Sequence, residues 1–200
     1  MKRKALLISL IALAMALCVF AGATIAYLFV KTNTVTNTFS PSNIGLTLVE
    51  TTGDTYKMVP GVELSKNPKV TVTSDVEAYV YVKIEEKGSV TVDTTTYTFD
   101  DFISYAIASG WDVIEGTVDT NDSTNGNEVV VLSRKVGTGT NSFEILAGNK
   151  VTTNATVTKQ MMDKYTDSSV KLEFTAYAIQ TAGFNTAAAA WPTARDQASN

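Results

Sequence analysis

The chain has 200 residues with 16 Lys and Arg, 20 Asp and Glu, one Cys and no His, which gives a formal net charge of −4 at pH 7. An acidic chain has no broad positive field that would attract nucleic acid or anionic lipid. The lack of His excludes Ser-His-Asp triads, Cys-His dyads and HExxH zinc sites, and a single Cys excludes an internal disulfide.

The beginning of the chain has the composition of an export signal. Basic residues at positions 2–4 precede an apolar run over residues 5–30, and Lys31 is the next charged residue. A basic start, an apolar stretch and small residues before a cut are the parts of a secretory signal peptide. We expect a signal peptide over residues 1–26. The alternative is an uncleaved anchor, because about 20 apolar residues can span a bilayer.

Small residues indicate where a signal peptidase would cut. Thr24 and Ala26 stand at positions −3 and −1 of a cut before Tyr27, while Ala21 and Ala23 allow a cut before Thr24. The cut before Tyr27 removes three positive charges and the only cysteine, which leaves 13 Lys and Arg against 20 Asp and Glu, a formal charge of −7. The remaining chain is long enough for one core without disulfides. We expect it to be secreted to the extracellular space or the cell surface.

Beyond Lys31, apolar and polar residues alternate in Thr- and Val-rich runs, the pattern of half-buried strands. The clearest run covers residues 76–86. One face of it carries Ala78, Val80, Val82 and Ile84, and the other carries Glu77, Tyr79, Tyr81, Lys83 and Glu85. Further strands are expected in IGLTLVE (44–50), in KVTVTS (69–74), and at residues 89–93, 111–115, 128–136, 142–146, 151–158 and 170–180.

Turn dipeptides separate these runs, and a few short segments favour helix. The expected turns are Pro60-Gly61, Asn67-Pro68, Lys87-Gly88, Asn125-Gly126 and Gly148-Asn149. Helices are expected at residues 100–109, with Gly110 as the C-cap, at residues 159–165, and at residues 186–191, where Pro192 would end the helix. The sequence therefore predicts an all-β domain over residues 41–200, an antiparallel sandwich or jelly roll with a few short helices, preceded by an extension at residues 27–40.

Few residues are candidates for chemistry. Carboxylates alone can catalyse glycoside hydrolysis, and the candidates are Glu77, Glu85, Glu86, Glu115 and the pair Asp100/Asp101. A charged outer strand face is the simpler explanation for the first three. We therefore expect no catalytic residue, no cofactor-binding residue and no metal ligand, and we do not expect an enzyme.

Two other features allow a functional and a structural interpretation. The loop at residues 119–128, DTNDSTNGNE, offers oxygen ligands of the kind that calcium prefers, but Thr124 stands where an EF-hand loop requires Gly. A solvated hairpin tip explains it more simply. Tyr79 and Tyr81 form either an exposed binding patch or a face that packs beneath a helix or a second sheet.

Several segments, in this order, resemble the TasA/camelysin group of exported proteins. They are the exit GATIAYLF (22–29), Thr38-Phe39, IGLTLVE, Met58 to Gly61 with Pro68 after it, AYVYVKIEE (78–86), FTAYAIQ (174–180) and FNTAAAAWP (184–192). The resemblance implies cleavage by a signal peptidase of the SipW type and a jelly-roll domain that assembles into extracellular fibres of a biofilm matrix. It also implies that the N-terminal segment of one subunit adds as a strand to its neighbour, with accessory matrix proteins as further partners. A metalloprotease activity described for the family does not carry over, because the chain has no His.

The residues after the expected cut have strand character themselves. One alternating face of this segment carries Tyr27, Phe29, Val35 and Phe39, interrupted by Lys31 and Asn33. A strand that adds to an open sheet edge gains backbone hydrogen bonds and side-chain pockets, and a head-to-tail contact that does not close yields a filament. The sequence leaves open whether this segment joins a neighbour, pairs within its own domain or forms a tail. It also leaves open a monomeric adhesion module that uses Tyr79/Tyr81 or the 119–128 loop, and a secreted hydrolase.

Overall fold

The computed structural model describes residues 42–53, 56–116, 128–166 and 170–197, together with Lys4, Ile11 and Met15. The chain divides into two compact units, Met1–Ser40 and Pro41–Asn200. The expected cleavage residues Thr24, Ala26 and Tyr27, the expected strand residues Phe29, Val35 and Phe39, and all of the 119–128 loop except Glu128 lie outside the described residues.

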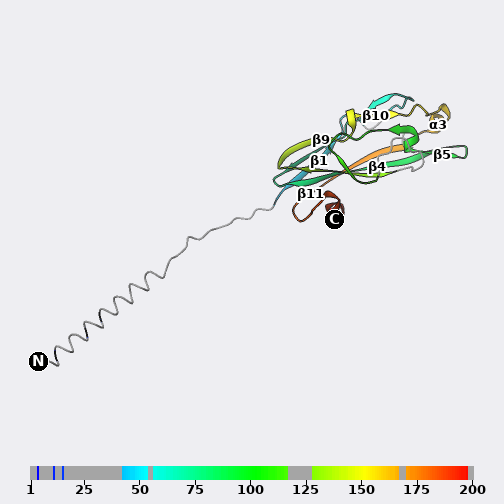
Figure 1. Cartoon of the computed structure of the whole chain (residues 1–200). Coiled ribbons are helices and arrows are strands. Elements are labelled where there is room, and N and C mark those ends of the chain that lie inside the picture. Colours follow the sequence, from blue (N-terminus) through cyan, green and yellow to red (C-terminus); the bar gives the residue numbers. More distant parts are fainter. Residues whose placement is uncertain are drawn as a thin grey trace. The chain divides into compact units, whose positions relative to one another are not determined.

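The second unit is built mainly from β-strands with a few short helices (Figure 1). The strands are β1 (Ile44–Val49), β2 (Glu63–Ser65), β3 (Lys69–Ser74), β4 (Ala78–Val92), β5 (Thr95–Thr98), β6 (Ile103–Ser104), β7 (Asp112–Glu115), β8 (Val129–Val136), β9 (Gly139–Glu144), β10 (Lys150–Thr153) and β11 (Val170–Gln180). The helices are α2 (Phe99–Phe102), the short 3₁₀ turn η1 (Ala147–Asn149), α3 (Lys159–Lys164) and α4 (Ala187–Gln197).

All strand pairs are antiparallel, so the prediction of an all-β antiparallel domain is confirmed. One sheet has the order β1-β3-β9, another β11-β4-β8-β7 with β5 on the far part of β4, and a small third sheet the order β2-β10-β6. The registers follow the alternation in the sequence, for example Leu46 opposite Val72 and Phe174 opposite Ile84.

The main core lies between the inward faces of β3, β4 and β8. The side chains of Val70, Val72, Val80, Val82, Ile84, Val130 and Leu132 have no exposed surface. Burying one aliphatic side chain of this size stabilises a fold by about 1.5–3 kcal/mol. The predicted inward face of β4 is therefore confirmed.

A smaller apolar cluster covers the other face of β4, beneath α4. The side chain of Tyr81 is fully buried, its ring centroid lies 5.2 Å from that of Trp191, and its hydroxyl donates a 2.8 Å hydrogen bond to the carbonyl oxygen of Ala187. Tyr177 packs on the same indole at 5.1 Å. The idea of an exposed Tyr79/Tyr81 binding patch is therefore wrong for Tyr81, which packs beneath a helix.

Strand β4 does not turn at Lys87-Gly88 as predicted. It runs on to Val92, because Gly88 takes a positive φ of 94° and redirects the strand instead of reversing it. Its partners change at this point: Gly88 pairs with Val170 of β11, and Ser89 pairs with Thr98 of β5.

The helix predicted at residues 100–109 is much shorter. Helix α2 ends at Phe102, and Ile103 then pairs with Thr153 of β10 while Ile107 forms a bridge to Leu146. These pairings with distant strands outweigh the helical spacing of the sequence. In the same way β10 ends at Thr153, well before the end of the strand predicted at residues 151–158.

Helix α3 lies where a helix was predicted, but α4 continues beyond its predicted end at Pro192. Pro192 has no N–H to donate to the carbonyl oxygen of Ala188. Because Ala188 is exposed, water can donate a hydrogen bond to that oxygen instead. Trp191 and Ala194 are buried on either side of Pro192. Packing on the sheet thus stabilises the last turns of the helix.

Candidate functional site

The two edge strands β1 and β11 lie side by side, and no ladder joins them in the described residues. Their inward-facing side chains belong to the main core but are only half-buried, in contrast to the fully buried ones of β3 and β4. We call this surface the seam and define it by Ile44, Leu46 and Leu48 of β1 and Leu172, Phe174, Ala176 and Ala178 of β11. An apolar surface that is half-covered at a sheet edge is a place where another apolar segment can bind.

The backbone of β11 is paired on one edge only. Val170 to Gln180 pair with Gly88 to Ala78 of β4 over the whole length of the strand. Among the described residues, no ladder joins its other edge, although β1 lies beside it (Figure 1). That free edge presents N–H and C=O groups which can pair with a further strand.

A pocket of about 230 Å³ opens at the beginning of β11, and we call it the first pocket. It is lined by Tyr56, Met58, Leu64, Lys66, Phe99, Ile103, Val151, Tyr165, Val170, Lys171, Leu172 and Glu173. Most of this wall is apolar or aromatic. The charged Lys171 and Glu173 are exposed and of opposite sign, so the pocket favours an apolar group over a charged one.

A second, wider pocket of about 490 Å³ lies at the other end of β11. It is lined by Ser42, Ile44, Ala178, Ile179, Gln180, Ala182, Gly183, Phe184, Thr193 and Gln197. Both pockets are lined by consecutive β11 residues, so each borders the backbone of the strand. One pocket therefore lies at the beginning of β11 and the other at its end.

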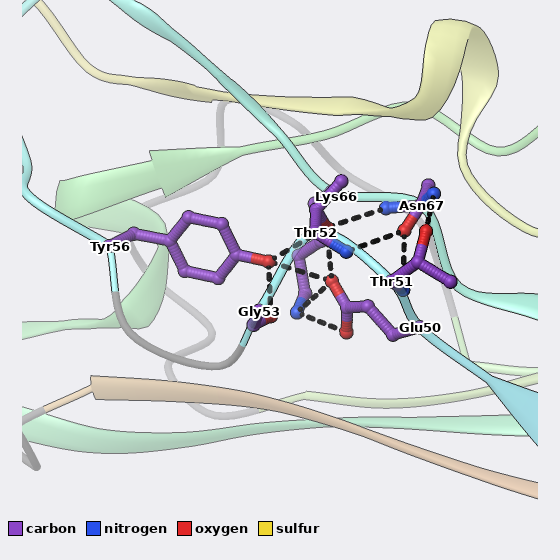
Figure 2. A network of polar contacts seen from close by, with 7 residues as sticks. All are labelled: Glu50, Thr51, Thr52, Gly53, Tyr56, Lys66 and Asn67. Atoms are coloured by element: carbon purple, nitrogen blue, oxygen red, sulfur yellow. Dashed lines mark hydrogen bonds and ion pairs between the residues drawn. The ribbon is translucent and has the colours of Figure 1, made fainter.

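A buried ion pair fixes the end of β1 next to the first pocket (Figure 2). Lys66 is only 9% exposed, and its Nζ lies 2.9 Å from Oε2 and 3.1 Å from Oε1 of Glu50. The hydroxyl of Tyr56 donates to the same carboxylate at 2.8 Å. The lysine charge is therefore neutralised by Glu50, which keeps the pocket wall effectively uncharged.

The same network ties the segment after β1 to the segment after β2. The side-chain oxygen of Asn67 accepts hydrogen bonds from the backbone N–H groups of Thr51 at 2.9 Å and Thr52 at 3.1 Å (Figure 2). The Lys66 ammonium also lies 5.5 Å from the ring centroid of Phe174, within the range of a cation–π contact. One end of the seam is thus held in a defined position.

The predicted carboxylate candidates separate into two groups, and only Glu86 and Asp100 come together. Glu86 is 6% exposed and accepts a 2.7 Å hydrogen bond from the Tyr105 hydroxyl. Burial raises the pKa of Glu86, and burial together with the charge of Glu86 raises the pKa of Asp100 to about 7. Burial and the same carboxylate also raise the pKa of Tyr105. The expectation that Glu86 lies on a charged outer face is wrong, because it shares the inward parity of Ile84.

The remaining carboxylates have ordinary partners. Glu77 pairs with Lys135 at 2.9 Å, and Glu85 pairs with Lys83 at 3.0 Å. The carboxylate of Glu115 accepts a 2.8 Å hydrogen bond from the indole N–H of Trp191. Asp101 accepts one of 2.7 Å from the backbone of Thr98, at the start of α2. These contacts support local structure.

Little else in the described residues indicates chemistry. No group of three or more Asp, Glu, His or Cys is placed to hold a metal ion in the described ranges. Within the same ranges, none of the helices has the length and apolarity needed to cross a bilayer. No protein-family model matches the chain, and neither does any curated protein or solved structure.

The alternation in the sequence predicts the strands of the seam but not the seam itself. Alternation shows which side chains share a face, but it does not show which strands end at an edge. Lys66 and Glu50 were also missed, since they are 16 residues apart in the chain and meet only through the fold. The parity of Glu86 with Ile84 is the one sequence feature that indicates its burial.

Proposed function

We propose that this chain is an exported structural protein whose jelly-roll domain, residues 41–200, assembles into extracellular fibres after removal of a signal peptide at residues 1–26. In each contact, the N-terminal extension (residues 27–40) of one subunit adds as a strand to the seam of the next. The observation that carries the proposal is the free edge of β11, with half-buried apolar side chains beneath it and a pocket at each end.

The physical chemistry of the seam suits a strand better than a small ligand. The free edge supplies a row of backbone donors and acceptors, and the seam residues supply apolar contacts on one face only. A strand with apolar residues on alternate positions satisfies both at once. Tyr27, Phe29, Val35 and Phe39 supply such residues on one face of the extension, and Lys31, Asn33 and Asn37 occupy the remaining positions of that face.

The position of Ser42 determines at which end of the seam each subunit would be linked in such a filament. Ser42, the first described residue of the domain, lines the second pocket, so each subunit's own extension joins its domain at that end of the seam. An extension that fills the neighbour's seam links the two subunits head to tail. Such a contact repeats without closing and produces a filament.

The test compares a chain that begins at Tyr27 with a chain that begins at Ser40. Electron microscopy of the first should show filaments, and sedimentation of the second should show monomers. Excess synthetic peptide of sequence 27–39 should shorten filaments, because it occupies the seam without continuing the chain. Filaments of unchanged length from the chain that begins at Ser40 would refute strand donation, and a chain from Tyr27 that stays monomeric at high concentration would favour the monomeric adhesion module.

A further inference from the structure

We propose that an apolar turn at residues 59–62 of one subunit docks into the second pocket of another subunit, as an additional contact at each junction of the fibre. We call this turn the knob and define it by Val59, Pro60, Gly61 and Val62. The inference rests on the proposed function for the order of the subunits. It does not depend on how the extension pairs with the seam.

The knob presents apolar surface to solvent. All four of its residues are exposed, with 52% of Val59 and 43% of Val62 accessible. None of the four carries a charge, and the neighbouring Glu63 is neutralised by an ion pair with Lys150. Apolar residues that gather at one exposed point, in contrast to scattered ones, are a candidate surface for contact with another molecule.

Hydrogen bonds fix the shape of the knob. The N–H of Val62 donates to the carbonyl oxygen of Val59 at 3.0 Å, which closes the turn. Gly61 takes the positive φ of 77° that a turn of this type requires after Pro60. Thr153 of β10 donates to the carbonyl oxygen of Val62 at 3.0 Å and accepts from the N–H of Gly61 at 2.9 Å. A turn held in this way loses little conformational freedom when it binds.

The second pocket offers a complementary surface. Its volume of about 490 Å³ leaves ample room for aliphatic side chains, since a cavity of about 150 Å³ already accepts benzene. Apolar surface comes from Ile44, Ile179 and Phe184, and polar groups come from Gln180 and Thr193. None of the lining residues is charged. An uncharged pocket suits an uncharged knob, because no ion loses its hydration when the two meet.

The knob and the second pocket lie at opposite ends of the domain. Met58 and Leu64, which flank the knob in the sequence, line the first pocket together with Val170 at the beginning of β11. The second pocket lies at the other end of this strand, around Gln180. A strand of 11 residues is about 36 Å long. A subunit therefore cannot place its knob in its own second pocket.

This arrangement favours a contact that repeats along a filament. An exposed apolar group that fits a pocket elsewhere on the same molecule makes a heterologous contact, which propagates when it does not close. In the proposed fibre, each extension leaves its domain beside the second pocket, where Ser42 lies, and enters the seam of the next subunit. In a head-to-tail order, the next subunit presents its first-pocket end at this junction, and its knob with it. Strand donation and the knob contact then have the same polarity.

The knob contact is too small to hold two subunits by itself. Four residues bury far less than the roughly 1,000 Å² that a stable interface requires. We therefore expect the chain from Ser40 to associate only in the millimolar range and to sediment as a monomer at lower concentrations. In the fibre, the donated strand keeps the two surfaces close together, so the effective concentration of the knob is high.

The first test is Val59→Asp in the chain from Tyr27, because a carboxylate loses its hydration in an uncharged pocket. We expect at least a tenfold higher critical concentration for filament growth, which corresponds to about 1.4 kcal/mol. The matched control is Val113→Asp, which adds the same charge at a valine of β7 that is 46% exposed. It should leave growth nearly unchanged. Ala182→Lys, in the wall of the second pocket, should restore growth when combined with Val59→Asp.

The outcomes separate this inference from the function on which it rests. Equal growth of the Val59→Asp and Val113→Asp chains would overturn the knob contact, whereas strand donation would stand as long as the chain from Ser40 forms no filaments. Filaments from the chain that begins at Ser40 would refute strand donation alone. Because Val59 is exposed, thermal unfolding of Val59→Asp should match that of the parent chain, which separates lost assembly from lost folding.

A second measurement needs neither filaments nor the extension. NMR spectra of the chain from Ser40, recorded as its concentration rises into the millimolar range, should show shifts of the Gly183 and Phe184 amides at the second pocket and of the Gly61 amide in the knob. Val59→Asp should remove both sets of shifts. Spectra of the parent chain that do not change with concentration would overturn the knob contact, whatever the outcome for strand donation.

Discussion

The centre of the sandwich and the seam differ in how completely they are covered. In the centre, which we call the closed side, β3, β4 and β8 have neighbours on both edges, and Val72, Val82 and Leu132 have no exposed surface. On the side of the seam, β1 and β11 each pair on one edge, and Leu46 and Phe174 are only half-buried. The residue types are similar on both sides, so what differs is the number of neighbours.

The core is therefore fully covered at the centre of the sandwich and only half-covered at the seam. Exposed sheet edges tend to pair with other chains unless charges, prolines or bulges protect them. The first part of β11 carries the exposed charges of Lys171 and Glu173, whereas Ala176 and Ala178 further along are small and apolar.

The largest expected effect comes from truncating one residue on each side. Ile84→Ala on the closed side should lower the free energy of unfolding by about 3–4 kcal/mol, because it leaves a cavity with no access to solvent. Leu46→Ala in the seam should cost only about 1 kcal/mol, because that side chain is already partly solvated in the folded monomer. Urea unfolding of both variants in the chain from Ser40 provides the measurement. Equal losses would show that the seam is as closed as the core.

The ion pair beside the first pocket gives the next largest effect. Glu50→Ala leaves the Lys66 ammonium largely buried without its partner, and we expect a loss of about 2 kcal/mol in unfolding free energy. The double variant Glu50→Leu with Lys66→Met removes both charges and should recover most of that loss. Thermal unfolding of the two variants separates the cost of an unpaired buried charge from the net contribution of the ion pair. If the double variant does not recover this free energy, the ion pair also positions the end of β1 through its geometry.

The alternation of the sequence was enough to predict the strands and their inward faces, as in β3, β4 and β11. It was not enough to predict completeness of burial, because IGLTLVE and AYVYVKIEE have the same period and differ only in their position in the sheet. The prediction of a helix at residues 100–109 was wrong for a related reason. Ile103 and Ile107 find partners in Thr153 and Leu146, about 40 to 50 residues away, and local spacing carries no information about them.

The candidate site could likewise be predicted only where it depends on local alternation. The alternation of Tyr27, Phe29, Val35 and Phe39 predicts a segment that binds along a sheet edge. That binding stays a prediction. The free edge of β11 and the two pockets depend on which strands end up adjacent. The acid pair of Glu86 and Asp100 depends on the same kind of long-range placement, since the two residues belong to β4 and α2.

The smallest expected effect concerns this acid pair on the closed side. The folded state raises the pKa of Asp100 from 3.8 to about 7, through burial and through Glu86, Glu128 and Asp101 nearby. Asp100 therefore keeps a proton in the folded state that the unfolded chain releases above about pH 4. Its contribution to stability is complete below that pH and is lost as the pH rises to about 7.

Because Asp100 is partly open to solvent, we expect a modest loss between pH 4 and pH 7, about 1 kcal/mol or about 3 °C in melting temperature. Asp100→Asn cannot ionise and should flatten this part of the pH profile. Asp112→Asn, an exposed carboxylate outside the pair, should leave the slope unchanged. A profile that Asp100→Asn does not alter would mean that water reaches Glu86 and Asp100, and that the closed side is less closed than the buried valines indicate.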